Sequence, residues 1–307
     1  MEFSHYSVML EECIEGLDIK PDGIYIDGTC GGAGHSARIA QKLTGGMLYG
    51  IDRDPTAVRI ASERLAGLKA KVLKGNFSDM KALTAEEGVR EADGILLDLG
   101  VSSHQLDTLE RGFSYHGSAP LDMRMSQEGF SARDLVNTAS FEELSRILFE
   151  YGEEKFARKI ADTIIKRREI RPIETTDELA DIVCSSIPAK FRREKNPCKK
   201  TFQALRIAVN CEFDELDKAL DDGFEMLKPG GRMCVITFHS LEDRMVKQRF
   251  ASFCKGCICP PDFPVCVCGK EPRGKLVSRK PIEPSERELA ENNRSHSAKL
   301  RIIEKIM

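Results

Sequence analysis

A glycine-rich turn follows the first short apolar segment of the chain. Residues 23–27 have the pattern of a β-strand, and the stretch Gly28-Thr-Cys-Gly-Gly-Ala-Gly-His35 comes next, before a helical pattern begins. Glycines let the backbone bend sharply beneath a ligand, and the unpaired N–H groups at a helix start attract an electron-rich group. This turn predicts a nucleotide-like ligand, and a purely structural tight turn is the alternative.

The glycine spacing narrows the choice of nucleotide. A dinucleotide site needs Gly-x-Gly-x-x-Gly, whereas the glycines here stand at 28, 31, 32 and 34. The turn also has no phosphate-binding lysine of the Walker type. An adenosine ligand without phosphates remains, and S-adenosylmethionine is the common one.

Three further strand ends carry side chains that suit such a ligand. Asp52 ends the second predicted strand, where a carboxylate can accept both ribose hydroxyls. Phe77 follows the third and can lie against an adenine face. Asp98 ends the fourth, where it could hold the amino group of the ligand or accept a hydrogen bond from a methyl-accepting amine, and Gln105 could close over the cofactor. Helix caps and core packing are the structural alternatives for each.

The surrounding pattern predicts a parallel sheet covered by helices. Apolar runs at 23–27, 47–52, 71–74 and 94–98 alternate with helical patterns at 35–43, 55–66 and 79–90. After residue 103 about ninety residues are helical, and the sheet pattern returns with a helix over 201–227, a turn at 228–231, a strand at 232–238 and an edge strand at 297–304. The carboxyl ends of parallel strands share one edge, so the candidate residues should meet there.

This alternation predicts an α/β fold with an inserted all-helical domain. We expect a core formed by residues 1–109 and 200–307, an insertion at 110–199, and a Cys-rich extended arm at 254–284. The 307 residues, with 46 basic and 49 acidic side chains, suit a globular chain of about two domains. Apolar runs stop short of the ~20 residues that span a bilayer, and the start lacks a signal-peptide pattern, so we expect a cytoplasmic protein without membrane contact.

Charge is unevenly distributed along the chain. Residues 155–206 hold fourteen basic and seven acidic side chains, and residues 244–301 hold thirteen and six, although the whole chain has a net charge of −3. Two basic segments on an acidic body favour a polyanionic partner such as nucleic acid, because phosphate neutralisation supplies much of nucleic-acid affinity. Solvated helix faces are the alternative.

Five of the eleven cysteines lie within fifteen positions, at 254, 257, 259, 266 and 268. Their density would suffice for one tetrahedral zinc, but the paired Cys-x2-Cys knuckles of a zinc ribbon are missing. Reduced thiols without metal are the alternative, and we assign no metal ligand from the sequence.

Long collinear blocks resemble one family over nearly the whole chain. The blocks include His5-Tyr-Ser-Val-Met-Leu10, Gly50-Ile-Asp-Arg-Asp-Pro55, Asp93-Gly-Ile-Leu-Leu-Asp-Leu-Gly-Val-Ser-Ser103, Glu110-Arg-Gly-Phe-Ser114, Pro120-Leu-Asp-Met-Arg-Met125, Tyr151-Gly-Glu-Glu154, Thr201-Phe-Gln-Ala-Leu-Arg206 and Phe238-His-Ser-Leu-Glu-Asp-Arg244. The chain is similar in these blocks to the MraW family, also called RsmH, of bacterial methyltransferases that act on a cytosine N4 of 16S ribosomal RNA.

The resemblance implies a class I, Rossmann-like S-adenosylmethionine-dependent methyltransferase sheet with an inserted substrate-recognition domain. It implies cofactor contacts at Ala33, Gly34, His35, Asp52, Phe77, Asp98 and Gln105. It places the target in the decoding centre, so the implied partner is 16S rRNA or the small ribosomal subunit, and a homodimer is compatible with it. Among these residues Asp98 is the candidate catalytic group.

Two other functions stay open at the level of sequence. A DNA or other amino-methyltransferase would use the same cofactor, although such DNA enzymes generally carry Asp/Asn-Pro-Pro-aromatic where this chain has Asp98-Leu-Gly-Val. A non-catalytic nucleic-acid binding scaffold would need no cofactor, so substitution of Asp52 would then change nothing.

Overall fold

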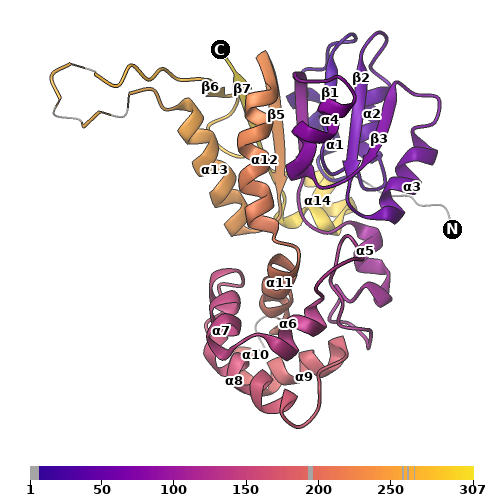
Figure 1. Ribbon diagram of the computed structural model, residues 1–307, viewed down its shortest axis with the longest axis vertical. Helices are drawn as coiled ribbons and strands as arrows, with labels where there is room; N and C mark the ends of the chain where they lie inside the picture. The colour runs from indigo at the N-terminus through magenta and orange to yellow at the C-terminus, as the bar shows by residue number, and fades with distance from the viewer. Residues whose placement is uncertain (1–6, 193–195, 258, 261–262, 266) are drawn as a thin grey trace. The chain divides into compact units, whose positions relative to one another are not determined.

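The computed structural model describes residues 7–192, 196–257, 259–260, 263–265 and 267–307. The chain divides into two compact units (Figure 1). Unit 1 contains residues 1–100 and 214–307, and unit 2 contains residues 101–213. The boundaries expected from sequence, at 110 and 199, both fall inside unit 2.

Unit 1 is built on a seven-stranded sheet of order β3-β2-β1-β4-β5-β7-β6. The strands β1 to β5 pair in parallel and β7 runs antiparallel to β5 and β6. This order is that of a class I methyltransferase sheet, so the predicted fold class is confirmed. The strands are β1 Ile24–Asp27, β2 Met47–Asp52, β3 Ala70–Lys74, β4 Ala92–Asp98, β5 Leu227–Thr237, β6 Gly274–Leu276 and β7 Lys299–Lys305.

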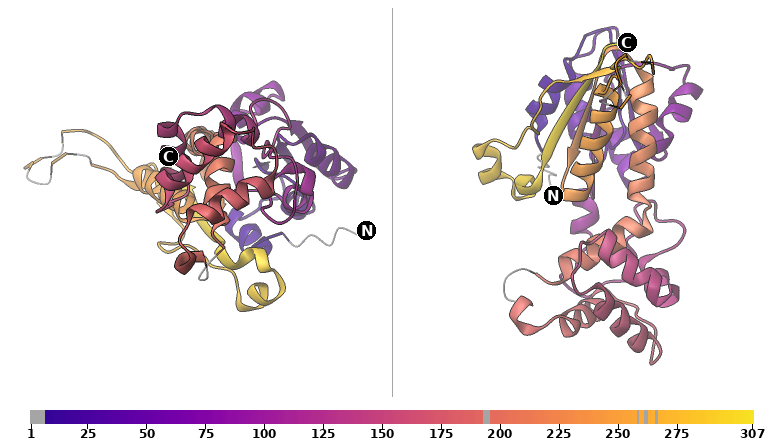
Figure 2. Two further views of the ribbon diagram at one scale, coloured as in Figure 1. Left: turned by 90° about the horizontal axis from the view of Figure 1, so that it is seen from below. Right: turned by 90° about the vertical axis from the view of Figure 1, so that its left-hand side faces the viewer.

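Helices cover both faces of the sheet (Figures 1 and 2). The buried residues of α4, α12 and α13 share one apolar cluster with the strands, and those of α1 and α2 share another. Alternate side chains of a strand point to opposite faces, so each central strand contributes to both clusters. The helices are α1 Leu10–Leu17, α2 Gly34–Ala40, α3 Pro55–Arg64, α4 Met80–Glu86, α12 Glu212–Met226, α13 Ser240–Cys254 and α14 Glu286–Glu291.

The helices are the only named elements in the described part of unit 2, which has a separate apolar core. Its helices often begin at polar N-caps: Thr175 and Glu178 form a reciprocal capping box at α9, and Ser140 accepts the Glu143 N–H at α7. The helices are α5 Ser103–Asp107, α6 Ala132–Thr138, α7 Phe141–Glu150, α8 Ala157–Arg168, α9 Thr176–Ser186, α10 Ala189–Arg192 and α11 Cys198–Val209. None of the described helices of either unit is long and apolar enough to cross a membrane.

Three sequence predictions about elements were wrong. The helix expected over 201–227 is broken between α11 and α12, where Cys211 adopts a left-handed φ of 51° that no continuous helix can contain. The strand expected at the sheet edge, β7, lies inside the sheet because β6, formed from the predicted arm, pairs with it. The turn at 228–231 is a bulge within β5, where the pairing with β4 shifts between Ala92 and Gly94.

Candidate active site

The candidate site lies where the strand order reverses. The chain starts at β1, moves outward to β3 and returns on the other side of β1 as β4, so the carboxyl ends of β1 and β4 form the topological switch point at which open α/β sheets bind ligands. Two hydrogen bonds hold these strand ends together. The Gly28 N–H donates to Leu96 O at 2.9 Å, and the Asp98 N–H donates to Thr29 Oγ1 at 2.6 Å.

The glycine turn leaves an open surface above β1. Gly31 has a φ of 48°, and a Cβ atom added there or at Gly32 would contact nothing closer than 3.8 Å. Ala33 is fully buried and starts α2 in a left-handed conformation, with a φ of 60°. The turn is therefore shaped by backbone conformation, and its open side can admit a ligand.

Asp52 is held by the glycine turn itself. One carboxylate oxygen accepts the Gly31 N–H and the other accepts the Asp54 N–H, both at 2.8 Å. Burial raises the pKa of Asp52, and these two N–H donors partly offset that rise. Its carboxylate is thus fixed in direction while each oxygen keeps a further lone pair for a ligand hydroxyl.

Phe77 lies against the same turn. A Cβ atom at Gly28 would come within 2.9 Å of Phe77 Cβ and 2.6 Å of Leu97 Cδ2, so only glycine permits this approach. Asn76 caps the short 3-10 helix Phe77–Asp79 by accepting the Ser78 N–H, which fixes the chain direction after β3. The structure therefore brings together the glycine turn, Asp52 and Phe77.

Asp98 is a carboxyl group without a matching cation. Its Oδ1 atom is buried and has no hydrogen-bond partner among the described residues. Burial, together with the negative charges of Asp27, Glu242 and Glu288, raises the pKa of Asp98 to about 8. A quarter of its side chain remains exposed, so a ligand can reach it.

The side chain of His35 is buried beside Asp98. Its ring is buried, with Nε2 3.0 Å from Val8 O and Nδ1 3.7 Å from Asp98 Oδ2. Burial lowers the pKa of His35 to about 4, so the ring is neutral at pH 7 and supplies no positive charge to Asp98. A ligand contact at His35 would therefore use its backbone.

Two acidic residues of the site were missed by the sequence analysis. Asp27 is buried, accepts the Ser36 hydroxyl at 2.6 Å and has its pKa raised by burial to about 6. Glu288 of α14 accepts the Met9 N–H at 2.7 Å and raises the pKa of Asp98. The position of Asp27 at a strand end was a usable signal, whereas nothing in the local sequence marks Glu288.

Gln105 belongs to unit 2. Its side-chain oxygen accepts the Ser102 N–H at 3.0 Å, and its own N–H donates to the Ser102 hydroxyl, which together form the capping box of α5. The structure thus gives Gln105 a role at this helix start, and its predicted contact with the cofactor stays a prediction.

Comparison with known proteins identifies the family. The model of the MraW methylase family matches residues 2–306. The chain belongs to the MraW methylase family. The resemblance stated from the sequence blocks is confirmed, and membership of a methylase family supports S-adenosylmethionine as the cofactor.

Curated relatives match over their full length. The chain is 54% identical over 311 residues to the "Ribosomal RNA small subunit methyltransferase H" of Lachnospira eligens, covering 100% of this chain and 99% of that protein. It is 53% identical over 309 residues to the protein of the same name from Clostridium botulinum (strain Loch Maree / Type A3), covering all of both. Among solved structures, an rRNA methylase from Streptococcus thermophilus has a TM-score of 0.44 at 11% identity, covering 99% of this chain and 100% of that one.

Proposed function

We propose that this member of the MraW methylase family transfers a methyl group from S-adenosylmethionine to the N4 amine of a cytidine in the decoding centre of bacterial 16S rRNA. The small-subunit rRNA substrate is supported by the names of relatives that are more than 50% identical over the whole chain. The cytidine N4 target comes from the family resemblance of the sequence blocks. The observation that carries the chemistry is the Asp98 carboxyl at the switch point, whose buried Oδ1 atom has no hydrogen-bond partner among the described residues.

The residues at the sheet edge fit a cationic adenosine cofactor. Three acids, Asp27, Asp52 and Asp98, converge there, and burial raises the pKa of each, which is a cost that a bound cation would relieve. When bound, S-adenosylmethionine supplies an electrophilic methyl group on a positively charged sulfur. We assign the ribose to Asp52 and the adenine to Phe77, and of the two roles open to Asp98 we assign it contact with the methyl-accepting amine.

The remaining proposed cofactor contacts are at the glycine turn and at Gln105. The backbone of the turn at Ala33, Gly34 and His35 would hold the methionine end, and Gln105 is assigned as a cofactor contact by the resemblance alone. These assignments rest on the resemblance and on the open surface above Gly31 and Gly32.

Asp98 is the proposed catalytic residue. The exocyclic amine of cytosine is a weak nucleophile because its lone pair is delocalised into the ring. An ionised Asp98 that accepted a hydrogen bond from the amine N–H would favour a pyramidal nitrogen. It would take up the amine proton as the N–CH3 bond forms and the S–CH3 bond of the cofactor breaks, which leaves a neutral thioether. A positive charge on a bound cofactor would lower the pKa of Asp98, so that this carboxyl would be ionised at neutral pH.

Unit 2 contains the whole of the first basic segment and is the proposed RNA-binding part. On α8, Lys166 pairs with Asp162 at 2.7 Å, and Arg168 donates to two carbonyl oxygens of the same unit. Arg167, between them, is exposed. Exposed cations such as Arg167 suit the phosphates of structured RNA, in which an unpaired base is presented to the enzyme.

The test uses small ribosomal subunits that lack the modification. Purified protein and labelled S-adenosylmethionine are incubated with them, and the modified nucleoside is mapped by mass spectrometry. We expect N4-methylcytidine at one position of 16S rRNA. A matched pair of variants controls the assay: Asp52→Asn removes the charge from the proposed site, whereas Asp22→Asn removes one at the amino end of β1, on the opposite edge of the sheet.

The same assay separates the alternatives. Label on DNA alone would identify a DNA methyltransferase, and label on a different base would reject the N4 target. A scaffold would bind RNA without label, and its Asp52→Asn variant would behave like the parent. Parallel reactions with free rRNA show whether the substrate is the RNA or the assembled particle.

A further inference from the structure

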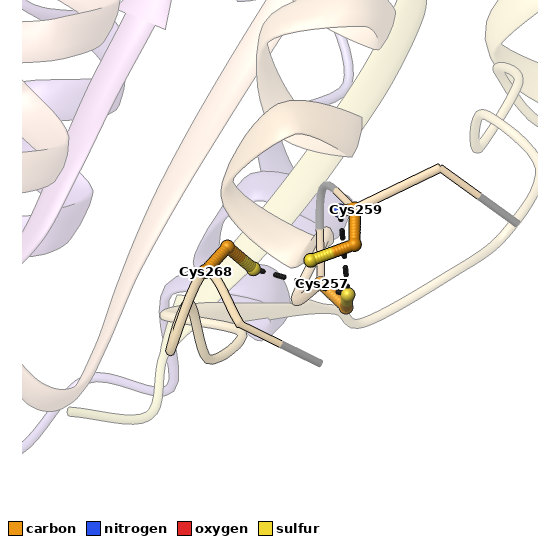
Figure 3. Close-up of side chains that lie close together, drawn as sticks. All are labelled: Cys257, Cys259 and Cys268. Carbon is orange, nitrogen blue, oxygen red and sulfur yellow. Dashed lines mark hydrogen bonds between the residues drawn. The ribbon is translucent and has the colours of Figure 1, made fainter. Parts of the chain in front are cut away.

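We propose that Cys257, Cys259 and Cys268 form a zinc site, in which the metal orders the arm that leaves α13. Their three sulfur atoms lie within 4.8 Å of one another (Figure 3). This inference is independent of the methyl-transfer site and does not rest on the proposed function.

The distance between two of the sulfurs matches that of a tetrahedral thiolate centre. Two thiolates that share one zinc at 2.3 Å are about 3.8 Å apart when the site is tetrahedral. Cys257 Sγ and Cys268 Sγ are separated by 3.8 Å. This distance is much longer than the ~2.05 Å of a disulfide bond, and it leaves room for a metal ion against both sulfurs.

Backbone N–H groups point at two of the sulfurs. The Cys259 N–H donates to Cys257 Sγ and the Val267 N–H donates to Cys259 Sγ, both at 3.4 Å. Hydrogen bonds to a charged form stabilise it, so these donors favour the thiolates that a metal requires. The three cysteines come from both sides of the arm, and one ion would therefore tie its two sides together.

The described residues of the arm form no apolar core that could hold its two sides together. Among the described residues between 255 and 273 none is buried, and Val265 and Val267 are 70% and 73% exposed. Figure 1 shows this segment leaving unit 1 between α13 and β6. A short segment without a core is typically stabilised by a metal or by disulfides.

The base of the arm is firmly attached to unit 1. The Arg273 N–H donates to Phe253 O at 3.0 Å, and the Arg273 guanidinium lies 5.5 Å and 5.6 Å from the ring centres of Phe224 and Phe253. Cys254, just inside this base, has its thiol pKa raised by burial and is not part of the cluster. Cys266 completes a second Cys-x-Cys pair in the sequence but lies outside the described residues.

The test measures metal in the full chain. Protein purified under reducing conditions with zinc, then dialysed, is analysed by plasma mass spectrometry, and we expect about one zinc per chain. The variant Cys257→Ser/Cys259→Ser/Cys268→Ser should lose it. Cys211→Ser, which removes an exposed thiol of unit 2, is the matched control and should keep it. A separate Cys266→Ser variant shows whether that thiol is the fourth ligand.

A second readout does not depend on how the variants fold. Cobalt added to the metal-depleted parent chain should give the sulfur-to-metal charge-transfer band and the intense visible bands of a tetrahedral thiolate site, and zinc should abolish them. Zinc absent from the parent chain, zinc retained by the triple variant, or a disulfide among these cysteines in protein purified under reducing conditions would each overturn the proposal.

Discussion

The two groups of chemically active side chains in this protein are positioned in opposite ways. At the switch point, Asp27, Asp52 and Asp98 sit at the ends of strands, and backbone N–H groups fix Asp52 in direction. In the arm, three thiols converge although no described residue between 255 and 273 is buried. The apolar clusters of unit 1 hold the acids in place, whereas the thiols need a ligand to keep them together. Binding of the cofactor should therefore change the structure of the switch point little, whereas binding of zinc should change the structure of the arm much more.

The largest expected effect is on the chemical step. Asp98→Asn keeps the size of the side chain but removes the carboxylate that accepts the amine N–H. We expect the single-turnover methylation rate at saturating cofactor to fall by about 10²–10⁴-fold. Asp22→Asn should leave this rate unchanged, and a rate for Asp98→Asn within a factor of three of the parent would remove Asp98 from the mechanism.

The same substitution should raise the stability of the ligand-free protein. The pKa of Asp98 is raised from 3.8 to about 8 on folding. The protonated form of Asp98 contributes in full to the stability of the folded state below pH 4. This contribution is lost as the pH rises to about 8, because the unfolded chain releases the proton near pH 4 whereas the folded chain keeps it until about pH 8. Asp98→Asn should therefore be more stable than the parent at pH 8.5, by on the order of a few kcal/mol, and similar to it at pH 4. Urea unfolding at both pH values tests this, and a difference that does not depend on pH would contradict it.

Loss of Asp52 should weaken cofactor binding. Asp52→Ala removes an acceptor for the ribose hydroxyls and also releases the N–H groups of Gly31 and Asp54. A charge-assisted hydrogen bond contributes about 1.5–3 kcal/mol, so the loss of even one should raise the Kd for S-adenosylmethionine by about 10–100-fold in calorimetry. An unchanged Kd would place the ribose elsewhere and would favour the scaffold alternative.

The smallest expected effect is that of zinc removal from the arm on the stability of the whole chain. Removal of zinc by a chelator should speed tryptic cleavage at the exposed Lys255 and Lys270, while the Tm of the chain shifts by no more than about 2 °C. Peptide mapping and a melting curve measure the two. A large fall in Tm would show that the arm stabilises unit 1. It would contradict the expectation that zinc orders mainly the arm.

Much of the fold was predictable because its signals are local. The parallel strands and the helices that follow them appear as apolar runs and helical periodicity in the sequence, and the acids Asp52 and Asp98 stand where two of those runs end. The break at Cys211 and the strand β6 were not predictable in this way. A left-handed residue has no periodic signature when it is not glycine, and a three-residue strand is too short to have one.

The sequence alone determined the α/β class, the glycine turn and the order in which acids and aromatic residues reach one sheet edge, since each follows from spacing between near neighbours. The tertiary structure decided the chemical state of those residues. The pKa of Asp98 depends on burial and on Glu288, which is itself held by a hydrogen bond to Met9 across 279 positions of the chain. The distance between the Cys257 and Cys268 sulfurs likewise depends on how the arm folds back. Contacts between distant residues leave no periodic trace in the sequence, so only the folded chain determines them.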